Sequence, residues 1–103
     1  MGWIGVDLDG TLAVYEGWKG GSEIGDPVPL MLDRVKTWIS EGKEVRIFTA
    51  RASAPELIEP IESWCLRHLG KILPVTNVKD FSMIELWDDR AVRVEMNTGV
   101  RIR

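Results

Sequence analysis

The sequence predicts a single α/β domain built on a mainly parallel sheet. Three observations lead to this prediction: 103 residues allow one hydrophobic core, short apolar runs alternate with helical patterns, and polar residues follow the ends of those runs. The order strand, helix, strand, helix, strand and further strands calls for right-handed crossovers between parallel strands. We therefore expect residues 1–103 to form one unit.

The first predicted strand is the apolar run Trp-Ile-Gly-Val at residues 3–6, which ends at Asp7. Residues 12–25 then contain four glycines together with Tyr15 and Trp18. This composition is typical of a mobile loop or short hairpin flap, and the segment is too short to be a second domain.

A helix and a second strand are predicted next. Asp26 before Pro27 indicates a helix start, and apolar residues then recur at helical spacing until Gly42 ends the pattern. Val45, Ile47 and Phe48 form a second short strand, which leads into Thr49. The second strand, like the first, is therefore predicted to end at a polar side chain.

The second predicted helix contains a proline in its pattern. Ser53 followed by Glu56 is a capping-box sequence, and apolar residues continue at helical spacing to Gly70. Pro60 lacks a backbone donor and clashes with the preceding turn of a helix. It is therefore expected either to kink this helix or to delay its start.

The C-terminal part of the chain predicts short strands. Residues 72–75 and 84–87 are predicted strands, and the second of them leads directly into two aspartates. Residues 91–95 and 100–102 flank an Asn-Thr-Gly turn and are predicted to form a terminal hairpin.

Polar segments follow the predicted strands at residues 7–11, 49–51, 77–80 and 88–89. In open α/β sheets, ligands bind outside the carboxyl ends of the strands, so these segments are expected to converge. Together they supply carboxylates, a hydroxyl and two cations. This is the inventory needed to handle a metal ion and a phosphate.

The acidic residues of these segments predict a magnesium site. Asp7 and Asp9 point the same way if the strand stays extended, and Gly10 allows the chain to turn sharply after them. Gly10 is also predicted to bind the substrate phosphate. Oxygen ligands from Asp7 and Asp88, completed by a backbone carbonyl, water and a substrate phosphate, match Mg²⁺ better than zinc. The ion would shield the phosphate charge from an anionic nucleophile.

The remaining polar residues suit a phosphate. Thr49 can donate a hydrogen bond to a phosphoryl oxygen, Lys79 can neutralise charge there, and Arg51 offers a fork-shaped second contact. Lys71 competes with Lys79 for the lysine role. Arg51 and Asp89 have a structural interpretation as well, as an ion pair or a helix-end contact, and both alternatives stay open.

These motifs resemble those of the haloacid dehalogenase superfamily, of the small phosphatase kind. The four matching motifs are Asp7-Leu8-Asp9-Gly10-Thr11, Thr49, Lys79 and Asp88-Asp89. They span residues 7–89, which is nearly the whole chain. An acid at position 9 is similar to the phosphatase branch rather than the dehalogenases, and Thr-Ala-Arg at 49–51 is similar to the Ser-Gly-Arg of polynucleotide phosphatase domains.

The resemblance implies a Rossmann-like three-layer sandwich and a two-step hydrolysis. Asp7 would attack phosphorus to form an aspartyl-phosphate while Asp9 protonates the leaving oxygen, and Asp9 would then activate the hydrolytic water. Mg²⁺ would be held by the Asp7 carboxylate, the Asp9 backbone carbonyl and Asp88. Asp89 would be either a further ligand or a group that contacts the ligands without binding the metal.

The resemblance also bears on the catalytic set and the substrate. Thr49 and Lys79 complete the implied catalytic residues.

Many members of the superfamily carry a cap domain, but only residues 12–25 are available here, so no large cap is expected. Capless members tend to act on larger substrates or to borrow a cover from another subunit. A phosphorylated substrate is expected, with a nucleotide or polynucleotide end as a candidate, and a homo-oligomer is a candidate assembly.

Composition and missing motifs exclude several other classes. No apolar run is long enough to cross a bilayer, and the net charge of −3 argues against nucleic-acid binding by a generally basic surface. The single Cys65 agrees with a reducing compartment, so a cytoplasmic location without a membrane partner is expected. No P-loop is present, which argues against a nucleotide-binding kinase. A noncatalytic phosphate-binding or regulatory module, and phosphoryl transfer to an acceptor other than water, remain alternatives to hydrolysis.

Overall fold

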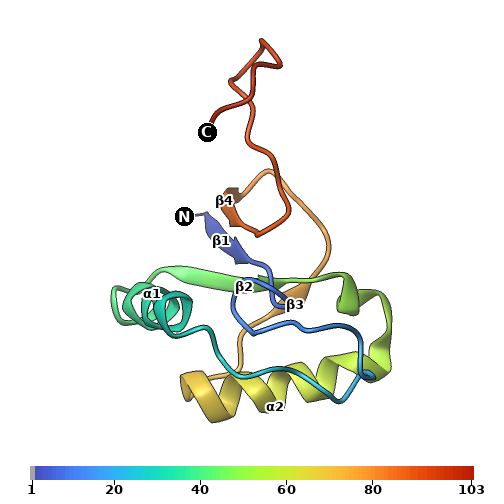
Figure 1. Ribbon diagram of the computed structural model, residues 1–103. Helices are drawn as coiled ribbons and strands as arrows, with labels where there is room; N and C mark the ends of the chain where they lie inside the picture. The colour runs from blue at the N-terminus through green and yellow to red at the C-terminus, as the bar shows by residue number, and fades with distance from the viewer. Residues whose placement is uncertain (1) are drawn as a thin grey trace.

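A four-stranded, all-parallel sheet with the strand order β3-β2-β1-β4 organises residues 2–103, the part of the chain that this computed structural model describes (Figure 1). The predicted α/β class, the parallel sheet and the absence of a large cap are confirmed. In chain order the elements are β1 (Trp3–Val6), α1 (Pro29–Ser40), β2 (Glu44–Phe48), the 3₁₀ helices η1 (Ala50–Ser53) and η2 (Pro55–Leu57), α2 (Ile58–Leu69), β3 (Val75–Thr76) and β4 (Met83–Trp87).

The hydrophobic core lies between one face of the sheet and the helices α1 and α2. Ile4 and Val6 alternate along β1 and share a single buried cluster with Val35 of α1 and Ile61 of α2. Because residues two apart in a strand point to the same face, α1 and α2 cover the same side of the sheet. Each such fully buried side chain contributes about 1.5–3 kcal/mol, so this face dominates the stability of the fold.

The opposite face of the sheet, here called the outer face, is covered by side chains and by the segment that joins β3 to β4. Trp3 is completely buried there, with the Arg46 guanidinium 4.5 Å from its ring centre. Its indole Nε1 donates to Asp80 Oδ1 at 2.8 Å, and Arg46 lies 3.6 Å from the other Asp80 oxygen. In residues 2–103 a loop, and not a helix, therefore crosses the outer face.

The first helix begins later than its sequence pattern predicts. α1 starts at Pro29, which suits the first helical position because proline has no N–H to leave unpaired. Asp26 and Pro27 instead close the base of the glycine-rich loop. Pro27 bridges Ala13, and the Val14 N–H donates to the Asp26 carbonyl at 2.8 Å.

The second helix shows how its proline is accommodated. Pro60 lies in the first turn of α2, where the missing N–H costs nothing, so the predicted delayed start is correct and the kink is not needed. The predicted capping box is wrong: Ser53 and Glu56 lie in η1 and η2, and the Ser53 hydroxyl accepts from Asn77 Nδ2 at 2.9 Å. Gly70 ends the helix in the left-handed conformation, as expected.

The later strands differ from prediction mainly in their bounds. β3 comprises only Val75–Thr76, whereas residues 72–75 were expected, and β4 begins one residue early. The terminal hairpin is confirmed by an antiparallel bridge between Val94 and Arg101. Among residues 2–103, no helix is long and apolar enough to cross a bilayer.

Candidate functional site

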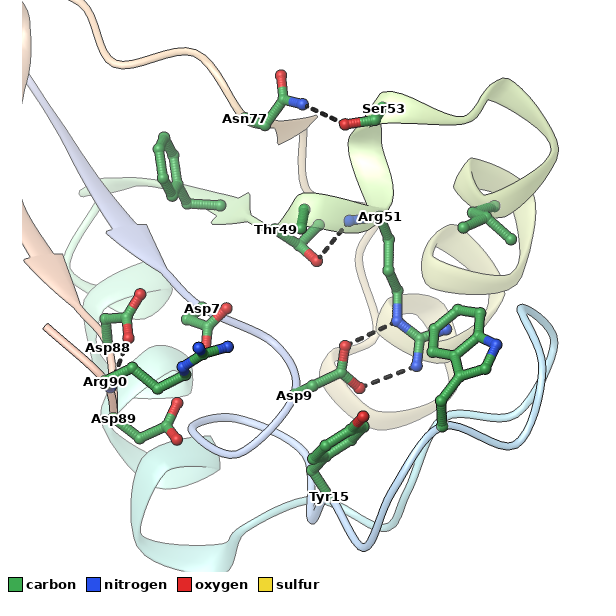
Figure 2. A pocket seen from close by; sticks show the side chains of 14 residues that line it. Asp7, Asp9, Tyr15, Thr49, Arg51, Ser53, Asn77, Asp88, Asp89 and Arg90 are labelled. Atoms are coloured by element: carbon green, nitrogen blue, oxygen red, sulfur yellow. Dashed lines mark hydrogen bonds and ion pairs between the residues drawn. The ribbon is translucent and has the colours of Figure 1, made fainter.

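The polar residues that follow the strands converge at the carboxyl edge of the sheet, as predicted. Asp7 follows β1, Thr49 follows β2, Asn77 follows β3 and Asp88 follows β4, and all four line one cavity of about 750 Å³ (Figure 2). β1 lies between β2 and β4, so the chain order reverses direction beside it. Ligands of open α/β sheets bind at such switch points.

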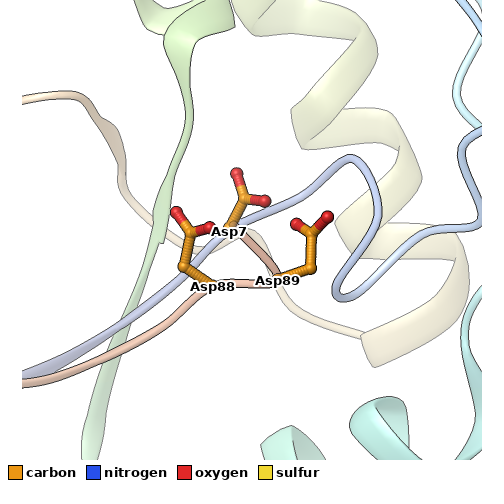
Figure 3. Close-up of side chains that lie close together, drawn as sticks. All are labelled: Asp7, Asp88 and Asp89. Carbon is orange, nitrogen blue, oxygen red and sulfur yellow. The ribbon is translucent and has the colours of Figure 1, made fainter. Parts of the chain in front are cut away.

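Three carboxylates form a compact group at the centre of this edge. Asp7, Asp88 and Asp89 each offer an oxygen, and the three oxygens lie within 4.8 Å of one another (Figure 3). An octahedral Mg²⁺ with bonds of about 2.0–2.1 Å needs its ligand oxygens about 3–4 Å apart, so small side-chain rotations bring these oxygens into range. The oxygen-only donor set suits a hard cation better than zinc.

The electrostatics of this group are unfavourable without a cation. The pKa of Asp7 is raised to about 7, first by burial and then by its hydrogen bond with Asp89 and by the charges of Asp88 and Asp89. Partial burial acts to raise the pKa of Asp89, but its hydrogen bonds with Asp7 and Thr11 outweigh this and lower it. Below about pH 7, Asp7 therefore holds a proton beside an ionised neighbour, an arrangement that a divalent cation would replace.

Gly10 and Thr11 hold the acidic group together. The Thr11 hydroxyl donates to Asp89 Oδ1 at 3.0 Å and accepts from the Asp89 N–H at 2.9 Å. Gly10 has φ +92°, and a Cβ there would lie 2.7 Å from an Asp89 oxygen. Its N–H donates to the Ala13 carbonyl, so the structure gives Gly10 a packing role and not the predicted phosphate contact.

Arg51 holds Asp9 through both carboxylate oxygens. Its Nε donates to Oδ2 at 2.8 Å and its Nη2 to Oδ1 at 2.9 Å (Figure 2). The Arg51 side chain is almost completely buried. The guanidinium is thus committed to an ion pair, and its predicted phosphate contact is not available in this arrangement. Of the two interpretations of Arg51, the structure contains an ion pair, but its partner is Asp9 and not Asp89, which bonds with Thr11 instead.

The same guanidinium also fixes the glycine-rich segment at residues 12–25, the predicted flap. Arg51 donates to the carbonyls of Gly21 and Glu23, both at 3.1 Å. The Trp18 ring lies against the guanidinium, with 4.7 Å between Arg51 Cζ and the ring centre. Trp64 of α2 donates to the Gly25 carbonyl at 2.9 Å. The predicted flap therefore exists as an ordered loop that is tied to Asp9 through Arg51.

Thr49 occupies the position predicted for a phosphate donor. It is buried at the wall of the cavity, and its hydroxyl oxygen accepts from the Arg51 N–H at 3.2 Å. Because the oxygen serves as the acceptor, the hydroxyl hydrogen remains available to a ligand in the cavity.

Lys79 is not brought into the cavity. It is exposed and does not line the pocket, and Lys71 is exposed on the chain before β3. After the short β3 the chain turns, because the Thr76 hydroxyl accepts from the Val78 N–H, and Asp80 is drawn onto the outer face by Trp3. Two cations do line the cavity: Arg51, which is paired with Asp9, and Arg90, directly after the acidic pair.

We expect Arg90 and Lys79 to respond differently to mutation. Arg90→Ala should raise the KM for a phosphate ester by about tenfold, since a lost charged hydrogen bond costs about 1.5–3 kcal/mol. Lys79→Ala should leave KM within about twofold, a change of less than 0.5 kcal/mol that is typical of a surface substitution. Steady-state kinetics of the two variants decide between them, and a large effect confined to Lys79→Ala would show that the β3–β4 loop moves into the site.

Apolar side chains that sequence reasoning had not assigned to the site form much of the cavity wall. They are Tyr15, Trp18, Phe48 and Leu57. Tyr15 and Trp18 come from the flap and are about half exposed. Their position depends on how the flap folds back, which no local pattern specifies. The cavity thus combines an acidic end with an aromatic wall.

Comparison with known proteins supports the fold. A solved structure of a conserved protein from Bacteroides thetaiotaomicron is similar, with a TM-score of 0.68 and 23% sequence identity over 88% of this chain and 78% of that chain. No protein-family model and no curated protein matches the chain in sequence. At this identity, the likeness establishes the architecture alone.

Proposed function

We propose that the chain is a Mg²⁺-dependent phosphohydrolase that cleaves a phosphate monoester through an aspartyl-phosphate on Asp7. The observation that carries the proposal is the convergence of the Asp7, Asp88 and Asp89 oxygens within 4.8 Å, in one cavity with Asp9 and Thr49. A phosphate-binding site alone gains nothing from so many carboxylates, because they repel an anion unless a cation is held among them.

The geometry suggests a division of roles. Asp7 attacks phosphorus as the ester P–O bond breaks, and Asp9 gives a proton to the departing oxygen. Asp9 then takes a proton from the water that attacks phosphorus, which releases inorganic phosphate and frees Asp7. Bound Mg²⁺ would be held by Asp7, Asp88 and Asp89 and would neutralise charge on the phosphoryl group.

The remaining contacts position these groups. The Thr49 hydroxyl can donate to a phosphoryl oxygen, and Arg90 adds positive charge on the β4 side of the cavity. Both Asp9 oxygens accept from Arg51 in this arrangement. To act as an acid, Asp9 must turn one oxygen from Arg51 toward the leaving group and take up a proton from solvent on that oxygen, so Arg51 sets the starting position of that movement.

The aromatic wall favours a leaving group that carries a flat ring. A nucleotide or a polynucleotide end meets this requirement, because bases stack on exposed aromatic side chains with about 1–3 kcal/mol each. We also propose a cytoplasmic setting, since the one cysteine, Cys65, is a buried free thiol that suits a reducing compartment.

Trp18→Ala is expected to reduce the preference for aromatic esters. The ratio of kcat/KM for phenyl phosphate to that for glycerol phosphate should fall by about tenfold, which corresponds to one lost stacking contact. Lys19→Ala, a neighbouring exposed flap residue, is the matched control and should leave the ratio unchanged. An unaltered ratio in Trp18→Ala would argue that the ring serves only to cover Arg51.

The proposed function is tested by phosphate release from aryl phosphates and a nucleotide panel, with Mg²⁺ and with EDTA. Activity should require the metal. Mg²⁺ at 100 times its Kd should also stabilise the fold by about 2.7 kcal/mol, which thermal melting detects as a shift in Tm. Asp88→Asn should reduce that shift, whereas Asp33→Asn on the exposed side of α1 should not. Metal binding without any phosphate release would favour the noncatalytic module.

A further inference from the structure

The outer face of the sheet ends in a strand edge without a partner. Within residues 2–103, β4 pairs with β1 alone, so its other edge presents free backbone N–H and C=O groups. Leu86 of β4 and Phe81, two residues before β4, are exposed, and Phe81 is fully exposed. An open edge with apolar side chains is a template for another strand, and proteins rarely leave one uncovered.

The C-terminal segment, residues 91–103 and here called the arm, projects away from the rest of the chain (Figure 1). Its hairpin is closed by the Glu95 N–H to the Val100 carbonyl at 2.7 Å and the Ile102 N–H to the Arg93 carbonyl at 2.8 Å. Every residue of the arm is exposed. The exposed apolar side chains of the arm are Val92, Val94, Met96, Val100 and Ile102.

The start of the arm is fixed by the acidic site itself. The Asp89 N–H donates to the Thr11 hydroxyl at 2.9 Å, and the Arg90 N–H donates to Asp88 Oδ1 at 2.7 Å. These bonds set the direction in which the chain leaves β4. Beyond these bonds the arm extends away from the sheet (Figure 1), so within residues 2–103 the β4 edge and the arm both remain uncovered.

The charges of the arm and of the remaining chain are opposite. The arm contains three arginines and one glutamate, a net charge of +2, so the remaining residues carry −5 of the chain's total of −3. Opposite net charge draws the arm of one chain toward the body of another, and the apolar side chains of the arm and of the outer face supply the area to be buried. A polynucleotide would use the arginines but would leave the apolar side chains of the arm in water, so a protein surface is the better match.

We propose that two copies of this chain form a dimer in which the arm of each lies on the outer face and β4 edge of the other. Each chain carries both an arm and an open edge. In a two-fold dimer each arm therefore covers the edge of the other chain, and no arm or edge is left for a third chain. The arm would add backbone hydrogen bonds to the edge as a β-strand does in strand-addition complexes. This inference does not depend on the proposed hydrolysis.

Light scattering of the full chain after size exclusion, over a dilution series, tests the proposal. The wild type should have the mass of two chains. Val94→Glu in the arm and Phe81→Glu beside the outer face should each shift the mass to one chain, with the circular dichroism unchanged. Leu66→Glu, which replaces a comparably exposed leucine on α2, should remain a dimer.

An equimolar mixture of Val94→Glu and Phe81→Glu provides the sharper test. In a mixed pair, the intact arm of the Phe81→Glu chain meets the intact outer face of the Val94→Glu chain, so the mixture should associate more strongly than either variant alone. A monomeric wild type at all concentrations overturns the proposal, and if such a monomer binds an oligonucleotide through the arm, the nucleic-acid alternative replaces it. A Phe81→Glu variant that stays dimeric also overturns it, in favour of contacts between arms.

Discussion

Asp7→Asn is expected to abolish hydrolysis and, in the same protein, to stabilise the metal-free fold. Asparagine cannot attack phosphorus to form an acyl phosphate, so kcat should fall by about 10⁴-fold or more, as when other enzymes lose their nucleophile. The amide also removes a partly buried charge that lies beside Asp88 and Asp89. The two effects have opposite signs, as expected of a residue kept for function at a cost in stability.

The pH dependence of stability should show the same effect. The pKa of Asp7 is raised from 3.8 to about 7 in the folded chain, so between these values the folded state holds a proton that the unfolded state has lost. The stability of the metal-free wild type should therefore decrease as the pH rises from about 4 to about 7. Because Asp7 is only half buried, we discount the shift for solvent screening and expect a loss of about 1–2 kcal/mol.

Denaturant unfolding in EDTA at several pH values measures this loss as the difference between the wild type and Asp7→Asn. The difference should be small near pH 4 and reach its full value above about pH 7. Asp33→Asn, an exposed aspartate on α1, is the matched control and should follow the wild type. If Asp7→Asn is destabilised at every pH, the carboxylate has a structural role and the electrostatic account of the site is wrong.

The acidic part of the candidate site was predictable because its residues are tied to strand ends. Asp7, Thr49 and Asp88 each directly follow an apolar run, and parallel strands place their carboxyl ends at one edge. The helix ends at Gly42 and Gly70 were predictable for a similar reason, since both glycines have positive φ and stop a helix locally. Features fixed by one short segment are visible in the sequence.

Features fixed by contacts between distant segments were not predictable. The position of Lys79 depends on Trp3, which holds Asp80 on the outer face from 77 residues away. The ion pair of Arg51 likewise depends on a distant residue, because its partner Asp9 lies 42 residues earlier in the chain. The flap must also fold back onto Arg51 to supply its two carbonyl acceptors. A fork-shaped cation near an acidic loop is compatible with both a phosphate and a carboxylate, and only the fold decides between them.

Arg51→Lys is expected to slow the chemical step through Asp9. Lysine keeps the positive charge but cannot bind both Asp9 oxygens and the carbonyls of Gly21 and Glu23 at once. Asp9 then loses its fixed position, and a misplacement of about 1 Å costs about 100-fold in rate. Arg51→Ala should in addition destabilise the fold by about 3–5 kcal/mol, because the Asp9 charge and the flap carbonyls lose their partner.

The leaving group distinguishes this role from a general loss of structure. Phenyl phosphate needs a proton on its departing oxygen, whereas 4-nitrophenyl phosphate has a similar shape and releases a much weaker base. Arg51→Lys should therefore lower kcat for phenyl phosphate far more than for the nitro compound, and Asp9→Asn should show the same pattern. Arg67→Lys, an exposed arginine in the last turn of α2, should change neither rate.

Hydrogen exchange connects that kinetic result to the flap. The amides of residues 20–25 should exchange faster in Arg51→Lys than in the wild type, with α1 unchanged, because the guanidinium is what ties this segment to the sheet. Equal rate losses for the two aryl esters, together with faster exchange throughout the chain, would mean that Arg51 serves stability alone. The opposite result is a loss of activity that is selective for phenyl phosphate, with faster exchange confined to the flap. It would establish that Arg51 positions both the acid Asp9 and the flap that covers the site.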